Sequence, residues 1–282
     1  MIGRGRALAW SAVFLVGGFA ASIVLVQLAY ALLGPRLALP GGALSLAAVQ
    51  SAAMVLIFGV LTWLIGRRKL GVTGADLGLV PVRRGSRGLV IGLGLGAAVA
   101  VAALALGVPV AGADWSEDGG TPGAWAGTVL MTGAVLLPAA FVEELMFRGA
   151  PLVALSRSFG RIPAAVGLSV CFGLVHLLNP GVTALGIANI VLAGVWLSVV
   201  FFTPGGLWAA TGAHLGWNLT LAGLGAPVSG LPFRMPWLDY APGSPAWLTG
   251  GSFGPEGGLL GTLCLLGGCV VAGRRVTQET IA

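Results

Sequence analysis

The sequence predicts an all-α membrane protein, a polytopic bundle of about eight transmembrane helices with both termini in the cytoplasm. Its 282 residues are 57% hydrophobic and 9% charged, with a mean hydropathy of +0.97, which ordinary soluble domains do not reach. Apolar runs of about 20 residues, long enough to cross a bilayer, recur along the chain, and basic residues gather in alternate connections between them. We therefore expect a single integral membrane domain over residues 1–282, surrounded by the lipid bilayer.

The apolar runs give the expected helices in order. To within several residues they extend from Ala7 to Leu33, Ala43 to Ile65, Leu89 to Val110, Ala124 to Phe159, Ile162 to Leu178, Thr183 to Phe202, Leu207 to Gly223 and Gly257 to Gly273. The first run is too long for a cleaved signal peptide and lacks an A-x-A site, so we expect it to remain as an anchor. The fourth contains Pro138, which predicts a kink because proline removes a helix hydrogen bond.

The distribution of charges predicts the orientation, because Lys and Arg near the ends of spans are retained on the cytoplasmic side. One side of an eight-span drawing holds Arg4, Arg6, Arg67, Arg68, Lys69, Arg83, Arg84, Arg87, Arg157, Arg161, Arg274 and Arg275. The other side holds Arg36 and Arg234 with the acidic residues Asp114, Glu117, Asp118, Asp239 and Glu256. The net charge of +6 thus follows from topology. We expect no nucleic-acid partner, because no basic stripe with interleaved aromatic residues is present.

Other segments carry predictions about packing and location rather than chemistry. Residues 224–256 form a non-cytoplasmic loop whose aromatic residues suit a membrane interface. The run "GLVIGLGLGAAVAVAA", from Gly88 onward, predicts close helix packing through small residues, and not a phosphate loop, because no strand precedes it. The three cysteines lie within spans and indicate no disulfide or zinc cluster. A single lysine beside abundant Arg, Ala and Gly indicates a bacterial genome, hence the plasma membrane of a bacterial cell.

The stretch "FVEELMFRG", residues 141–149, places three charges inside an apolar span. Each charge facing lipid at mid-bilayer would cost about 2.5 to 3.5 kcal/mol, so these residues must be paired or line a polar cavity. Glu144 and Arg148 are four residues apart, which predicts an intrahelical ion pair with a structural role. Glu143 points about 100° away from Glu144 and has no cation at helical spacing. Glu143 is therefore the candidate for chemistry.

The chain has only two histidines, His176 and His214, and both fall within apolar spans. "FGLVH" places Phe172 four residues before His176, and "HLGWN" places Asn218 four residues after His214. A lone intramembrane histidine is more often a hydrogen-bonded packing residue than a catalyst. A carboxylate near an imidazole, however, is what the activation of water requires. Counted at 1.5 Å per residue from the turn near residues 158–160, Glu143 and His176 lie at the same level, whereas His214 joins them only if helices tilt or shift.

Together, in order, "EELMFR", "FGLVH" and "HLGWN" resemble the EExxxR, FxxxH and HxxxN motifs of the CPBP family of intramembrane proteases, which includes the type II CAAX prenyl endopeptidases and bacterial Abi proteins. The motif-bearing core extends over about residues 124–223. The resemblance implies that Glu143 and His176 activate water, that His214 and Asn218 hold the developing oxyanion, and that Glu144, Arg148 and Phe172 support the site. Peptide hydrolysis in this way needs no nucleophilic serine or cysteine.

Metal dependence stays open at this point. Glu143, His176 and His214 could form a three-ligand zinc site with an open position, although the H-E-x-x-H helix of zinc proteases is absent and direct activation of water by Glu143 would use the same residues. The resemblance implies a membrane protein or lipidated peptide as substrate, with a prenylated CAAX protein as one case. Two other classes remain alternatives: a non-catalytic scaffold or bacteriocin-immunity protein, and a proton-coupled transporter, for which inverted repeats would be expected.

Overall fold

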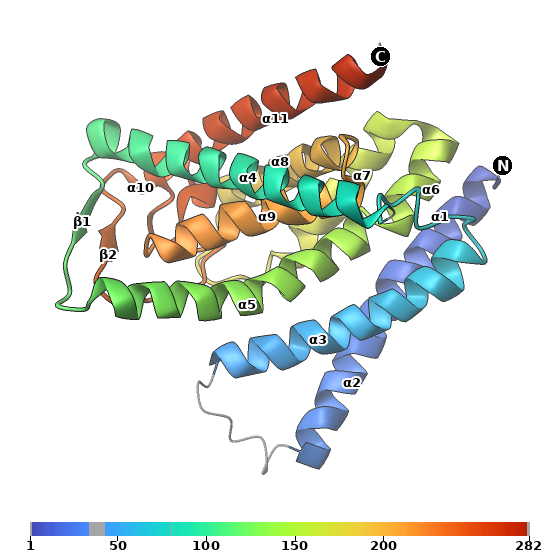
Figure 1. The fold of residues 1–282 in the computed structure, drawn as a ribbon, viewed down its shortest axis with the longest axis horizontal. Coiled ribbons are helices and arrows are strands. Elements are labelled where there is room, and N and C mark those ends of the chain that lie inside the picture. The colour runs from blue at the N-terminus through green and yellow to red at the C-terminus, as the bar shows by residue number, and fades with distance from the viewer. Residues whose placement is uncertain (1, 34–42, 80, 281–282) are drawn as a thin grey trace.

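The computed structural model describes residues 2–33, 43–79 and 81–280, and these form an almost wholly helical bundle (Figure 1). Its first two spans lie at one side. The first consists of α1 (Arg4–Ala12), a π-helical segment (Val13–Gly17) and α2 (Gly18–Leu33); the second consists of α3 (Ala43–Leu61) and a π-helical segment (Thr62–Arg67). Helices α2 and α3 pack against each other, and α3 also packs against α5.

The remaining helices form the main bundle. They are α4 (Val82–Ala111), α5 (Pro122–Phe147), α6 (Ala150–Phe159), α7 (Arg161–Val175), α8 (Ala184–Phe201), α9 (Gly206–Gly223) and α11 (Leu259–Thr280). Helix α9 is the centre, because it contacts α4, α5 and α8, and most of its residues are buried. Helix α8 packs on α7 and α11, and α11 packs on α4. The candidate residues on α9 are therefore surrounded by protein.

Six helices of the described part are long and apolar enough to cross a membrane. They correspond to the first four, the sixth and the eighth predicted runs. Helix α7 is a shorter apolar helix, and α9 is absent from the six although it has 18 residues. The protein is thus an integral, multi-pass helical membrane protein, while the count of eight spans stays a prediction.

The fourth predicted run differs in one respect from a single helix. Helix α5 ends at Phe147 and α6 begins at Ala150, so the chain leaves the α-helical path at Arg148 and Gly149. A Cβ added at Gly149 would overlap the carbonyl of Leu145, so this close turn requires glycine. The break places Arg148 at the end of α5, where its side chain turns into the bundle. Pro138 lies inside α5, and the kink expected there stays a prediction.

The glycines of α4 and α9 bring the two backbones into direct contact. A Cβ added at Gly92 would overlap the carbonyl oxygen of Ala209, and one added at Gly96 would overlap that of Ala213. From the other side, a Cβ at Gly216 would overlap the carbonyl of Leu93. This arrangement confirms the predicted packing through small residues.

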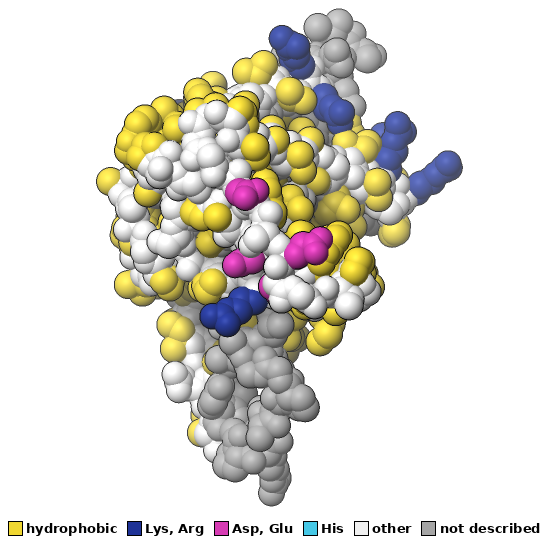
Figure 2. All heavy atoms as spheres, turned by 90° about the vertical axis from the view of Figure 1, so that its left-hand side faces the viewer, with side chains coloured by type: hydrophobic (Ala, Val, Ile, Leu, Met, Phe, Trp, Pro, Cys, Tyr) yellow, Lys and Arg dark blue, Asp and Glu magenta, His cyan; other side chains and the backbone are white. Residues whose placement is uncertain are grey.

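Charges separate between the two ends of the bundle. At one end β1 (Asp114–Ser116) pairs antiparallel with β2 (Asp239–Ala241). Figure 2 looks onto this end and shows acidic side chains on it. At the other end Arg157 binds Asp76 at 2.6 Å, and both ends of the described chain lie toward this half (Figure 1). The charge asymmetry predicted from the sequence is present. The assignment of this half to the cytoplasm stays a prediction.

The loop between α9 and α11 folds back on the bundle. It contains β2, the short helix α10 (Ala246–Thr249) and two 3₁₀ turns, Gly251–Phe253 and Pro255–Gly257. Phe253 is 1% exposed, and Gly257 and Gly258 lie against Gly250. The end of the loop is therefore part of the packed interior and not only an interfacial cap.

Candidate active site

Glu143 and Glu144 are adjacent on α5 but face different surroundings. Glu144 is fully buried, whereas the side chain of Glu143 is 33% exposed and lines a cavity. The predicted ion pair is present, with Nη1 of Arg148 at 2.9 Å from Oε1 of Glu144. Nη2 of Arg148 donates to the carbonyl of Gly194 on α8 at 2.9 Å. Arg148 thus ties the end of α5 to α8 while it neutralises the buried Glu144.

His214 lies between the two glutamates. Its Nδ1 is 2.8 Å from Oε1 of Glu144, and its Nε2 is 3.8 Å from Oε2 of Glu143. Because an ionised carboxylate only accepts hydrogen bonds, Nδ1 carries the proton and Nε2 faces Glu143. His214 therefore lies in the same site as Glu143. The positions of the two residues along their separate helices did not predict this.

His176 occupies the first position after α7, where the helix has ended at Val175. Its Nδ1 lies 2.7 Å from the carbonyl oxygen of Phe172, an acceptor, so this nitrogen also carries the proton. The ring of Phe172 packs on His176 at 4.7 Å and on His214 at 6.1 Å between centroids. The guanidinium of Arg148 lies 4.6 Å from the centre of the same ring. Phe172 therefore contacts three of the predicted site residues.

Asn218 lies one turn beyond His214 on α9 and faces the same cavity. Its side chain forms no hydrogen bond with another described residue, and neither does that of Glu143; Oε2 of Glu143 is a buried atom without a partner. These two side chains, which face the cavity without a hydrogen-bond partner, can bind a polar ligand there.

One cavity of about 450 Å³ collects these groups. Glu143 from α5, His176 from the end of α7, and His214 and Asn218 from α9 all line it, and so does Phe172. Glu144 and Arg148 are not among its lining residues, consistent with their supporting position behind His214. Apolar side chains form most of the remaining wall.

The lining residues that the sequence did not assign to the site include Asn179, Trp217, Ser229 and Glu256. Glu256 was counted only as an acidic residue of the outer loop. A usable signal existed, because Glu256 stands directly before the last apolar run and has no neighbouring cation. Asn179 begins "NPG" and was interpreted only as the end of a span.

The contacts of Glu143, His176 and His214 bear on the three-ligand metal site that the sequence left open. Within the described ranges, no group of three or more His, Cys, Asp and Glu side chains is placed to hold a metal ion. Nδ1 of His214 is bound to Glu144 and Nδ1 of His176 to a carbonyl, so each imidazole could offer only Nε2.

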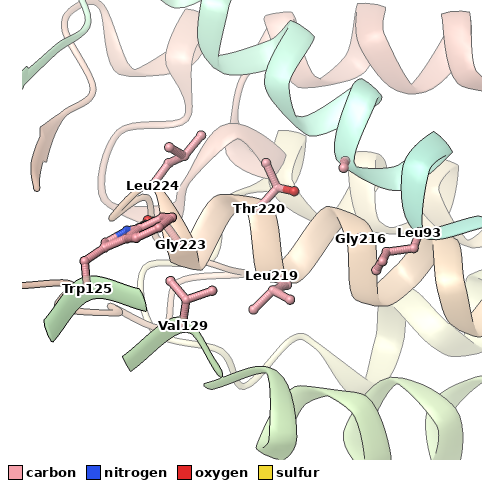
Figure 3. Close-up of a pocket in the computed structure, with 9 residues that line it drawn as sticks. Leu93, Trp125, Val129, Gly216, Leu219, Thr220, Gly223 and Leu224 are labelled. Atoms are coloured by element: carbon pink, nitrogen blue, oxygen red, sulfur yellow. Dashed lines mark hydrogen bonds between the residues drawn. The ribbon is translucent and has the colours of Figure 1, made fainter. Parts of the chain in front are cut away.

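A second cavity, of about 330 Å³, lies between α4, α5 and α9 (Figure 3). Its walls are apolar apart from the hydroxyl of Thr220, and no titratable side chain lines it. The indole of Trp125 closes one end and donates a hydrogen bond of 2.7 Å to the carbonyl of Gly223. This cavity offers space but no groups for chemistry.

The comparisons with known proteins agree with the position of the site. Residues 125–220 match the family described as type II CAAX prenyl endopeptidase Rce1-like. No match was found among curated proteins or solved structures. The matched segment extends from α5 to α9 and contains all three motifs and with them Glu143, His176, His214 and Asn218, which line the larger cavity. The motifs and this match both make the segment of residues 125–220 similar to the CPBP family of intramembrane proteases, which includes the type II CAAX prenyl endopeptidases.

Proposed function

We propose that the protein is an intramembrane endopeptidase that hydrolyses peptide bonds with a water molecule activated by Glu143 and His176. Its family consists of peptidases, which supports the reaction class. The observation that carries the proposal is the shared cavity, in which Glu143, His176, His214 and Asn218 meet although they come from three separate helices. An acyl-transfer site needs a base and oxyanion donors around one reacting carbonyl, and these four side chains supply both.

The proposed reaction proceeds in two steps. The Glu143 carboxylate takes a proton from water while Nε2 of His176 accepts the other hydrogen of that water, and the water oxygen attacks the peptide carbonyl carbon. The tetrahedral intermediate then breaks its C–N bond, and Glu143 returns the proton to the leaving amine. Glu143 can carry out this transfer because Oε2 of its side chain has no hydrogen-bond partner among the described residues.

The oxyanion of the intermediate is assigned to Asn218 and His214. The Asn218 amide is an unpaired N–H donor that faces the cavity. His214 donates from Nε2 when this nitrogen carries a proton as well as Nδ1, and the Glu144 carboxylate then supplies the counter-charge. Removing one such donor in other hydrolases lowers kcat by about 10² to 10³. Glu144 and Arg148 are positioning residues in this scheme.

The proposed substrates are membrane proteins or lipidated peptides cleaved near their C-termini, with prenylated CAAX-type proteins as the case that the family description names. The bilayer around the helices would bring such substrates to the cavity. We place the protein in the bacterial plasma membrane, on the basis of its composition.

The test is cleavage of a quenched C-terminal peptide library, with and without a prenyl group, by detergent-purified protein. Glu143→Gln and His176→Ala are compared with Glu117→Gln, the same change at an exposed glutamate of the polar end. We expect activity in the wild type and the control, and losses of about 10² or more in the two cavity variants. A chelator should leave the rates unchanged, because the scheme uses only side chains. A wild type silent on every substrate, or a fully active Glu143→Gln, would refute the proposal.

A further inference from the structure

Glu256 is a buried carboxylate that the proposed reaction does not use. It belongs to the 3₁₀ turn before α11, is 6% exposed and lines the same cavity as Glu143. Among the described residues it has no ion-pair partner. Because an unpaired buried carboxylate is costly, its surroundings must compensate for it.

Three hydrogen bonds provide this compensation. Oε1 of Glu256 accepts from the indole N–H of Trp217 at 3.0 Å. Oε2 accepts from the hydroxyl of Ser229 at 2.6 Å and from the backbone N–H of Ser229. The backbone carbonyl of Glu256 in turn accepts from Asn189 on α8 at 2.8 Å. The carboxylate is thus held on both sides by donors from different segments.

These segments lead to the two halves of the candidate site. Trp217 directly precedes Asn218 and lies one turn beyond His214 on α9. The carbonyl of Ser229 accepts from the side chain of Asn179 at 2.9 Å, and the backbone N–H of Asn179 donates to the carbonyl of His176 at 3.1 Å. Hydrogen bonds through Glu256, Ser229 and Asn179 therefore connect Trp217 on α9 to the turn that carries His176.

His176 depends on such support, because it follows the last residue of α7. One turn earlier, the Phe172 ring contacts both imidazoles. The network of Glu256 reaches His176 through the residues that follow it, by way of Asn179 and Ser229. On the proposed function, we infer that Glu256 is a positioning residue that fixes His176 relative to Asn218 and His214 across the cavity. The loop of residues 224–258 then forms part of the working site.

The test variant is Glu256→Gln, which keeps the length of the side chain but replaces one acceptor oxygen with an NH₂ donor. This group must face either Trp217 or Ser229, both of which donate, so one side of the connection is lost. The matched control is Trp125→Phe, which removes the 2.7 Å bond to Gly223 at the end of α9, directly before the same loop, and leaves the Glu256 network intact. Trp125 lies at the apolar cavity of Figure 3.

Two readouts separate positioning from general stability. On a peptide that the wild type cleaves, Glu256→Gln should lower kcat about tenfold or more, since small misplacements are costly in catalysis, and should change KM by less than about twofold. Trp125→Phe should keep both constants within about twofold of wild type. The second readout is independent of activity: with only two histidines, ring-labelled protein gives two assignable sets of NMR signals. The His176 signals should move in Glu256→Gln and stay in place in Trp125→Phe.

The outcomes distinguish this inference from the proposed function. A wild type that cleaves nothing counts against the peptidase, while a selective movement of the His176 signals still supports the connection. Unchanged His176 signals, or equal losses of kcat in Glu256→Gln and Trp125→Phe, would overturn the inference. If Glu256→Gln does not fold, Ser229→Ala replaces it; this variant removes one hydroxyl donor and should lower kcat about threefold with the same NMR change.

Discussion

Nδ1 of His214 lies 2.8 Å from Oε1 of Glu144, and the same oxygen lies 2.9 Å from Nη1 of Arg148. One buried carboxylate oxygen therefore neutralises a cation and orients an imidazole. The sequence predicted the ion pair between Glu144 and Arg148 but not the hydrogen bond to His214, because Glu144 and His214 are 70 residues apart. The two adjacent glutamates therefore differ in their contacts: Glu144 is buried and bound to Arg148 and His214, whereas Glu143 lines the cavity.

Glu144→Gln should destabilise the protein strongly. The substitution leaves Arg148, which is 1% exposed, without its counter-charge, and breaking a buried pair in this way costs about 3 to 5 kcal/mol. His214 also loses an ionised partner at Nδ1, so any folded protein should have a much lower kcat. Thermal unfolding in detergent, measured beside peptide cleavage, checks both effects.

The double variant Glu144→Gln/Arg148→Met separates the two roles. It contains no uncompensated charge, so most of the lost stability should return, because neutral replacements of buried pairs are often tolerated. Activity should not return, since His214 still lacks a carboxylate. Recovery of activity along with stability would mean that Glu144 acts only through the ion pair.

Phe172→Leu should reduce both stability and activity, and the loss of activity should exceed that of an equally buried phenylalanine outside the cavity. The change keeps the backbone carbonyl that holds Nδ1 of His176 but removes the ring between the two imidazoles. We expect a loss of about 1 to 2 kcal/mol in unfolding free energy and a decrease in kcat of about tenfold. Phe201→Leu is the control, because Phe201 is similarly buried but does not line the cavity. Equal losses of kcat in both variants would remove Phe172 from the site.

The sequence predicted the local relationships of this site well, because they depend on helical spacing. The Glu144–Arg148 pair, the Phe172–His176 neighbours and the glycine contacts of α4 all follow from residues three or four apart. The end of α5 at Phe147 was not predicted, because apolar residues resume directly after Arg148 and Gly149. Apolarity reports burial in lipid or protein alike, and does not show where a helix ends inside either.

Relationships between distant segments were beyond the sequence for a different reason. In the sequence, Glu256 looks like an ordinary acidic residue of an outer loop. It lines the cavity only because residues 224–258 fold against α8 and α9. Its partners Trp217 and Ser229 are 39 and 27 residues away, so no periodic pattern connects them. The proximity of His214 to Glu143 likewise depends on how α5 and α9 pack.

Asp76→Asn should produce a difference in stability that depends on pH. Burial acts to raise the pKa of Asp76, but hydrogen bonds from the backbone and hydroxyl of Thr73 and the charge of Arg157 outweigh it and lower this pKa below its ordinary value. A carboxyl group with a lowered folded-state pKa stabilises the protein above its unfolded pKa and loses this contribution as the pH falls through the folded value.

The pair is partly exposed, so the expected effect at pH 7 is below about 1 kcal/mol. Wild type should exceed Asp76→Asn in unfolding temperature at pH 7, and the difference should shrink as the pH falls below about 4. Unfolding temperatures measured at both pH values test this directly. A difference that grows on acidification would contradict the assigned sign.

Gly96→Ala should disturb the site through the backbone of α9. A Cβ at residue 96 would overlap the carbonyl oxygen of Ala213, the neighbour of His214, and would crowd the backbone nitrogen of Trp217. Overpacking of this kind costs about 1 to 3 kcal/mol, and relief by movement of α9 would displace His214 and Asn218. We therefore expect a lower unfolding temperature together with reduced kcat. Gly94→Ala is the matched control on the same helix, because a Cβ there meets no atom within 4 Å and alanine favours helix by about 1 kcal/mol. Equal stability and activity in the two variants would show that α4 does not set the position of α9.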